Sequence, residues 1–338
     1  MRKEVLAVGC ALMVFCGCGK NNAAQHYESG WAAMEKKDYT TAVNEFQQVI
    51  DQNSRLAESY RAEGIAYYSE KAYPEAIAAF SRSLNNMDDP DKEFKKDVQF
   101  YLAQARMDYG EVDKAIEVYS EILKAGEDEQ AFFLRGKAYI SMEDYKNAEK
   151  DFQRALEGCE DYNLYINIYQ IYVAHNKAVD GDAYLKMALE LEPQDGEDCY
   201  HRGRIYEYEK NYEAARDELK TAMEQGYEDA MLLLGRVYLE MEDPASARSM
   251  YQEYLQKSEQ GAKAYNGLAM CDIYDGAYDS ALENIAQGLK ENSKEDEQGL
   301  LYNEIVAYEY KRDFATAKEK MKIYLEQYPE DEAALREN

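Results

Sequence analysis

The chain has 338 residues, and 67 Asp and Glu against 39 Lys and Arg give it a formal net charge of −28. This charge argues against binding to nucleic acid and against electrostatic attachment to anionic lipid, because both need clustered Lys and Arg. Hydrophobic residues make up 46% of the chain and only 5 prolines occur, so we expect a folded chain built from helices.

The amino terminus has the pattern of an export signal. Met1-Arg2-Lys3 supplies positive charge, and an almost uninterrupted apolar run follows from Val5 to Phe15. That run is about half of the roughly 20 residues that span a bilayer, and it has the length of a signal-peptide core. A short buried helix and an uncleaved membrane anchor are the alternatives.

The segment that follows resembles a bacterial lipobox. Gly17 fills the small position before Cys18, whereas bulky Phe15 precedes Cys16 and also departs from the Leu that the family usually has there. The resemblance implies a lipoprotein signal peptide over residues 1–17, a lipid on Cys18, a tether over residues 18–23, and a membrane location on the extracytoplasmic face.

The rest of the chain repeats itself. One column is alanine with a single glycine, at spacings of 32 to 39 residues: Ala42, Ala76, Ala115, Ala148, Gly181, Ala215, Ala247, Ala281 and Ala317. Four residues after this column stands a large apolar residue, such as Phe46 or Phe80. Twelve residues before it the position is mostly small, as at Gly64 and Gly136.

These columns resemble the tetratricopeptide repeat, with its small residue, Tyr, turn, Ala and aromatic residue over 34 positions. The resemblance covers nine repeats over residues 24–329, with a short cap over residues 330–338. It implies an all-α fold, a right-handed α-solenoid of about nine stacked antiparallel helix pairs. Small residues let two helices approach, and periodic tyrosines fill the space around the contact, so most of the 32 Tyr are expected to be framework.

Two places depart from the period. Residues 85–95 add about five residues, and we interpret them as a solvated loop, because a calcium loop needs a glycine and a terminal Glu in register. In the fifth repeat, Tyr169 and Gly181 replace the small residue and the alanine. This repeat is either a softer joint or ordinary drift.

The family resemblance implies that the first helix of each pair lines a concave groove. Carried over by register, the candidate binding residues combine aromatic and apolar side chains with four cations and include no acid: Trp31, Arg61, Tyr68, Phe100, Phe133, Lys137, Tyr200, Arg204, Arg236, Met270 and Tyr302. This composition favours a peptide with apolar anchors and some negative charge. Mutual packing and pairing with nearby carboxylates is the alternative interpretation.

We therefore predict a non-enzymatic scaffold that binds a protein or peptide partner. A fixed assembly subunit of an envelope complex is the alternative function, and carbohydrate capture by Tyr and Trp is a third. No catalytic site, cofactor or metal site is expected, because His26, His175 and His201 are far apart and no phosphate-loop, GxSxG or HExxH motif occurs. The cysteines after residue 18 show no CxxC spacing.

Overall fold

The computed structural model describes residues 22–87, 91–258, 260–291, 293–331 and 334–335. Within these ranges it contains 18 α-helices and no strand, which confirms the predicted all-α fold. The predicted signal peptide and Cys18 lie outside the described residues. Among the described helices, none is both long enough and apolar enough to cross a membrane.

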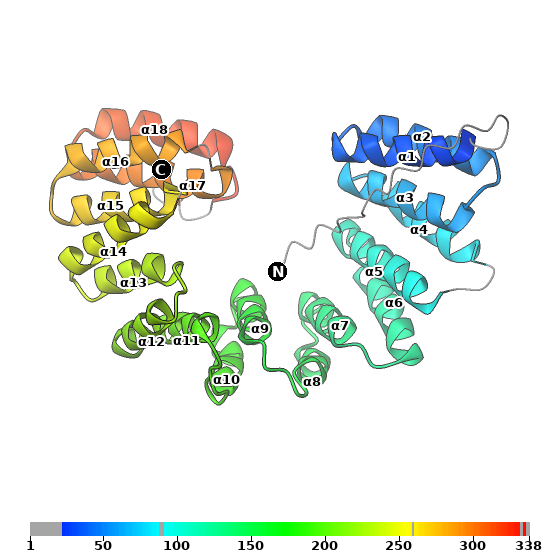
Figure 1. Cartoon of the computed structure of the whole chain (residues 1–338), viewed down its shortest axis with the longest axis horizontal. Coiled ribbons are helices and arrows are strands. Elements are labelled where there is room, and N and C mark those ends of the chain that lie inside the picture. Colours follow the sequence, from blue (N-terminus) through cyan, green and yellow to red (C-terminus); the bar gives the residue numbers. More distant parts are fainter. Residues whose placement is uncertain (1–21, 88–90, 259, 292, 332–333, 336–338) are drawn as a thin grey trace. The chain divides into compact units, whose positions relative to one another are not determined.

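The helices form two compact units, divided between Cys159 and Glu160. The first unit stacks four helix pairs (Figure 1): α1 (Asn22–Glu35), α2 (Tyr39–Asp51), α3 (Leu56–Ser69), α4 (Tyr73–Asn85), α5 (Lys92–Tyr109), α6 (Val112–Ala125), α7 (Glu129–Ser141) and α8 (Tyr145–Ala155). The second unit has five pairs: α9 (Tyr162–Ala174), α10 (Ala178–Leu189), α11 (Gly196–Tyr208), α12 (Tyr212–Glu224), α13 (Ala230–Glu240), α14 (Pro244–Lys257), α15 (Ala262–Tyr274), α16 (Tyr278–Lys290), α17 (Lys294–Tyr310) and α18 (Phe314–Gln327). The fifth repeat, α9 and α10, begins directly after the division.

The small columns form the contact within each pair. The eight alanines of the column are 0–3% exposed. A Cβ added at Gly64 would lie 2.6 Å from the ring of Phe80, which stands four residues after Ala76. Close approach of the two helices therefore requires a residue without a side chain at this position, as the periodicity predicts.

Each turn within a pair uses the same backbone geometry. The residue five positions before the alanine column has a positive φ, between 58° and 87°, in all nine described turns: Lys37, Lys71, Gly110, Glu143, Asn176, Lys210, Glu242, Gly276 and Arg312. Only two of these nine are glycine. The next residue often caps the second helix, as where Asp144 Oδ1 accepts from the backbone N–H of Asn147 at 3.2 Å.

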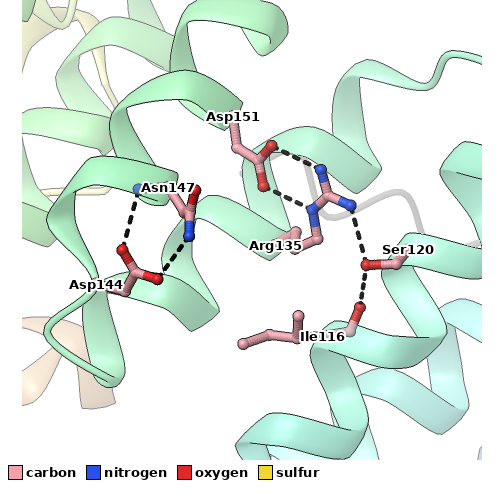
Figure 2. Close-up of polar contacts among 6 residues, drawn as sticks. All are labelled: Ile116, Ser120, Arg135, Asp144, Asn147 and Asp151. Carbon is pink, nitrogen blue, oxygen red and sulfur yellow. Dashed lines mark hydrogen bonds and ion pairs between the residues drawn. The ribbon is translucent and has the colours of Figure 1, made fainter.

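An ion pair recurs between the two helices of a pair. Figure 2 shows Arg135 of α7 donating to both carboxylate oxygens of Asp151 of α8, at 2.7 and 2.8 Å, and to Ser120 Oγ at 3.0 Å. In the sixth repeat the same two register positions hold Arg202 and Glu218, at 2.9 Å. In the ninth they hold Glu304 and Lys320, at 2.8 Å, so that the polarity is reversed.

The last repeat packs against residues beyond α18. Ala334 is fully buried with Tyr324, and the Tyr324 hydroxyl donates to Asp331 at 2.5 Å. Other parts of the predicted cap, residues 332–333 and 336–338, are outside the described residues.

Candidate partner-binding groove

A cavity of about 530 Å³ opens along the first helices of the last repeats in the second unit. It is lined by α11, α13, α15 and α17 together with the second helix α14: Tyr200, Asp229, Leu232, Leu233, Arg236, Tyr251, Tyr254, Gln260, Lys263, Asn266, Gly267, Met270, Ser293, Asp296 and Gly299. Three of the eleven predicted groove residues, Tyr200, Arg236 and Met270, are in this set.

Helical spacing brings these residues to one face. Tyr200, Leu232 and Asn266 occupy the same register position in three consecutive repeats, fifteen residues before the alanine column. Arg236 and Met270 stand four residues further along their helices, and residues i and i+4 lie one above the other on a helix. The predicted register therefore places these side chains together.

The wall of the cavity depends on glycine. The buried ring of Tyr251 lies where a Cβ on Gly267 would come within 2.3 Å of its Cζ, and one on Gly235 would come within 2.6 Å. Burial raises the pKa of the Tyr251 hydroxyl. Tyr251 is therefore a neutral side chain that forms part of the wall.

The cations of the cavity differ in their partners. Arg236 is 54% exposed, and its Nε lies 2.6 Å from Glu207 Oε1. Lys263 Nζ is 4.0 Å from Asp296. Glu207 is an acid that the sequence reasoning missed, although it stands at the register position that Tyr68 occupies in the second repeat. The groove of the second unit is therefore mixed in charge at this point.

Arg204 lies beside the cavity, one turn from Tyr200. Its Cζ is 5.8 Å from the centre of the Tyr200 ring, and its Nη1 donates to His201 Nδ1 at 3.3 Å. Burial raises the pKa of Tyr200, the charge of Arg204 opposes that rise, and of the weaker influences Asp229 adds to the rise while Arg236 and Lys263 oppose it. Three cations and one carboxylate therefore act on one aromatic side chain in a chain whose net charge is −28.

The predicted residues of the first unit do not line the cavity found there. Arg61 Nε donates to Asp97, and the Tyr68 hydroxyl donates to Asp108 at 2.5 Å. Three aromatic side chains pack against core rings at 5.6–6.3 Å between centroids: Trp31 on Phe46, Phe100 on Tyr119 and Phe133 on Phe152. These rings serve the packing that the alternative interpretation named.

Two predicted residues remain. Lys137 is exposed on α7, and no ion pair is found for it among the described residues. Tyr302 of the ninth repeat packs on Tyr324, with 5.8 Å between ring centroids.

A separate cavity in the first unit, of about 710 Å³, opens near the α2–α3 and α4–α5 connections. Arg55, Asn86 and Phe94 are among its lining residues, and the sequence reasoning identified none of them.

Comparison with known sequences agrees with this repeat geometry. Two sequence profiles, both described as tetratricopeptide repeat, match residues 27–91, 200–262 and 232–297, and residues 129–161. Together they match more than half of the chain. The chain belongs to the tetratricopeptide-repeat family.

Solved structures of several other proteins are similar to it. Yeast Tom70 is 14% identical with a TM-score of 0.50, over 91% of this chain and 78% of that one. A protein from Parabacteroides merdae is 16% identical with a TM-score of 0.46, over 84% and 99%. YrrB, a tetratricopeptide-repeat protein with an unusual peptide-binding site, is 26% identical with a TM-score of 0.35, over 55% and 96%. A search of curated proteins finds no match.

Proposed function

We propose that this tetratricopeptide-repeat protein is a lipid-anchored, non-enzymatic scaffold that binds a peptide segment of a protein partner in the cavity of the second unit. The observation that carries the proposal is the cavity itself, which joins apolar residues (Leu232, Met270) to Tyr200 and the cations Arg236 and Lys263. Its volume falls in the range of about 300–1,000 Å³ that is usual for ligand sites. Apolar anchors with a few placed charges are what peptide grooves use.

The test of the groove is selective loss of partner capture. The partner is isolated from detergent-solubilised envelopes, identified and purified, and its affinity is measured by calorimetry. Arg204→Glu together with Arg236→Glu is expected to abolish binding while circular dichroism stays unchanged. Arg216→Glu is the matched control, because Arg216 lies on the second helix α12 and pairs with Asp217. Equal affinities for all three proteins would exclude this groove.

The membrane anchor is tested separately. The apolar run and the small residue before Cys18 support lipidation there. In the native host, Cys18→Ser is expected to lose incorporation of labelled palmitate and to move the protein from the membrane to the soluble fraction. Cys16→Ser is the control and should stay labelled. Label retained in Cys18→Ser would reject this site.

The alternative function, a fixed subunit of an envelope complex, has its own test. A partner that stays bound through detergent extraction and exhaustive washing would favour that function over a peptide-binding scaffold.

A further inference from the structure

Arg204 differs from the other arginines that the register places in the groove. Arg61 is bonded to Asp97 and Arg236 to Glu207, whereas no carboxylate lies within 4.0 Å of Arg204 among the residues that the structure describes. A guanidinium carries five N–H donors. The hydrogen bond found for Arg204 is made to an imidazole, so most of its donors have no hydrogen-bond partner among the described residues.

The imidazole is itself held from a neighbouring helix. His201 of α11 is 5% exposed, and its Nε2 lies 2.9 Å from the side-chain Nδ2 of Asn163 of α9. The carboxylate of Glu197 is further from Nε2, at 3.8 Å. Burial, and then the charge of Arg204, lowers the pKa of His201 to about 4, so the ring is neutral at physiological pH.

A neutral imidazole has one donor and one acceptor nitrogen. Because Arg204 can only donate, Nδ1 must be the acceptor and Nε2 must carry the hydrogen. Asn163 faces Nε2 with its amide nitrogen, and a neutral ring with one acceptor cannot take hydrogen bonds from two N–H donors. Rotating the Asn163 amide by half a turn exchanges its nitrogen and oxygen, and Nε2–H then donates to that oxygen. With the amide in that orientation, donation runs from Arg204 through His201 to Asn163, and these bonds fix where the guanidinium stands relative to the ring of Tyr200.

We propose that His201, held by Asn163, is a positioning residue that orients Arg204 to bind a carboxylate of the partner peptide at the Tyr200 edge of the cavity. The inference rests on the proposed function of this groove. It assigns the acidic side chain of the partner to Arg204 and not to Arg236, because Glu207 already neutralises Arg236. A fork-shaped guanidinium binds a carboxylate through two parallel hydrogen bonds only when its plane is correctly oriented.

The test uses two fluorescein-labelled peptides, one of alternating Glu, Tyr and Leu and a twin with Gln in place of each Glu. Affinities are measured by fluorescence anisotropy. His201→Asn places an amide oxygen near the position of Nδ1, whereas His201→Gln places its amide near Nε2. We expect His201→Gln to weaken binding of the Glu peptide by about five- to tenfold, which lies within the range for loss of one ordinary hydrogen bond, and His201→Asn to change it by less than about twofold. The Gln twin should bind all variants equally.

A role of His201 in packing alone makes a different prediction. His201→Asn and His201→Gln would then weaken both peptides alike, and His201→Gln would have the same effect in an Arg204→Gln background; either result overturns the inference. Should the His201 variants fail to fold, Asn163→Leu gives the same comparison in both backgrounds. If neither peptide binds the wild-type chain, or if Arg204→Gln changes nothing, the proposed groove function fails as well.

Discussion

The ion pair between Arg135 and Asp151 is expected to be a local determinant of stability. The Asp151 side chain is 7% exposed and that of Arg135 is 18% exposed, and two hydrogen bonds join them. Removing one member of a buried pair costs about 3–5 kcal/mol. Asp151→Asn keeps one acceptor oxygen, and Arg135 keeps Ser120 and some access to water. We therefore expect a loss of about 2–3 kcal/mol in the free energy of unfolding.

The measurement is native-state hydrogen exchange across α7 and α8, supported by urea unfolding, because a stack of repeats need not unfold in one step. Glu127→Gln is the matched control. Its carboxylate pairs with Arg154 but is 78% exposed, so the loss should stay below about 1 kcal/mol. Replacing the Arg135–Asp151 pair by Met and Leu should cost less than Asp151→Asn alone. If Asp151→Asn and Glu127→Gln have equal effects, the buried pair does not stabilise the fourth repeat.

Three further predictions concern single side chains. Gly267→Ala should destabilise the second unit by about 1–3 kcal/mol in urea titrations, because its Cβ would meet Tyr251 at 2.3 Å, whereas a Cβ at Gly299 meets only Asn266 Nδ2 at 3.3 Å and should be tolerated. The pKa of His201 is lowered from 6.5 to about 4, so its contribution to stability is complete above pH 6.5 and decreases by about 3 kcal/mol on acidification to pH 4. Thermal melts of His201→Asn should lack that part of the acid dependence, and an unchanged profile would contradict the assignment. Burial raises the pKa of the Glu63 carboxyl, which costs stability as pH rises through that pKa. Glu63→Gln should therefore melt higher than wild type near neutral pH, with a difference that shrinks in acid, and a lower melting temperature would count against this reasoning.

The fold could be predicted because its contacts recur. Alanine at Ala76 and glycine at Gly64 are required wherever two helices touch closely, so a spacing of about 34 residues is enough to reveal the pairs. The structure confirms those columns as buried contacts. The departure at Gly181 marks the repeat that begins the second unit, and the sequence alone left its meaning open between a joint and drift.

The candidate site could be predicted only in part. Register identifies which residues share a face, but Phe100 and Phe133 share that face and pack on core rings. Glu207 was not predicted as a groove residue, because a single acidic residue on so acidic a chain indicates only a solvated surface. Gly267 was a sequence signal that could have indicated this part of the site, because it is a helical glycine outside the repeating columns. Glycine inside a helix costs about 1 kcal/mol relative to alanine, so an unscheduled one points to a close approach, here by Tyr251.

The residue of positive φ in each of the nine described turns within a helix pair allows the rigidity of this protein to be changed in small steps. Seven of the nine positions carry a side chain, among them Lys71 and Glu143, in a conformation that glycine adopts freely. Each replacement by glycine relieves local strain at the cost of a more flexible unfolded chain. The turns are separated by whole helices, so their effects should add. A graded series of variants could then vary the rigidity of individual repeats while leaving every groove side chain unchanged.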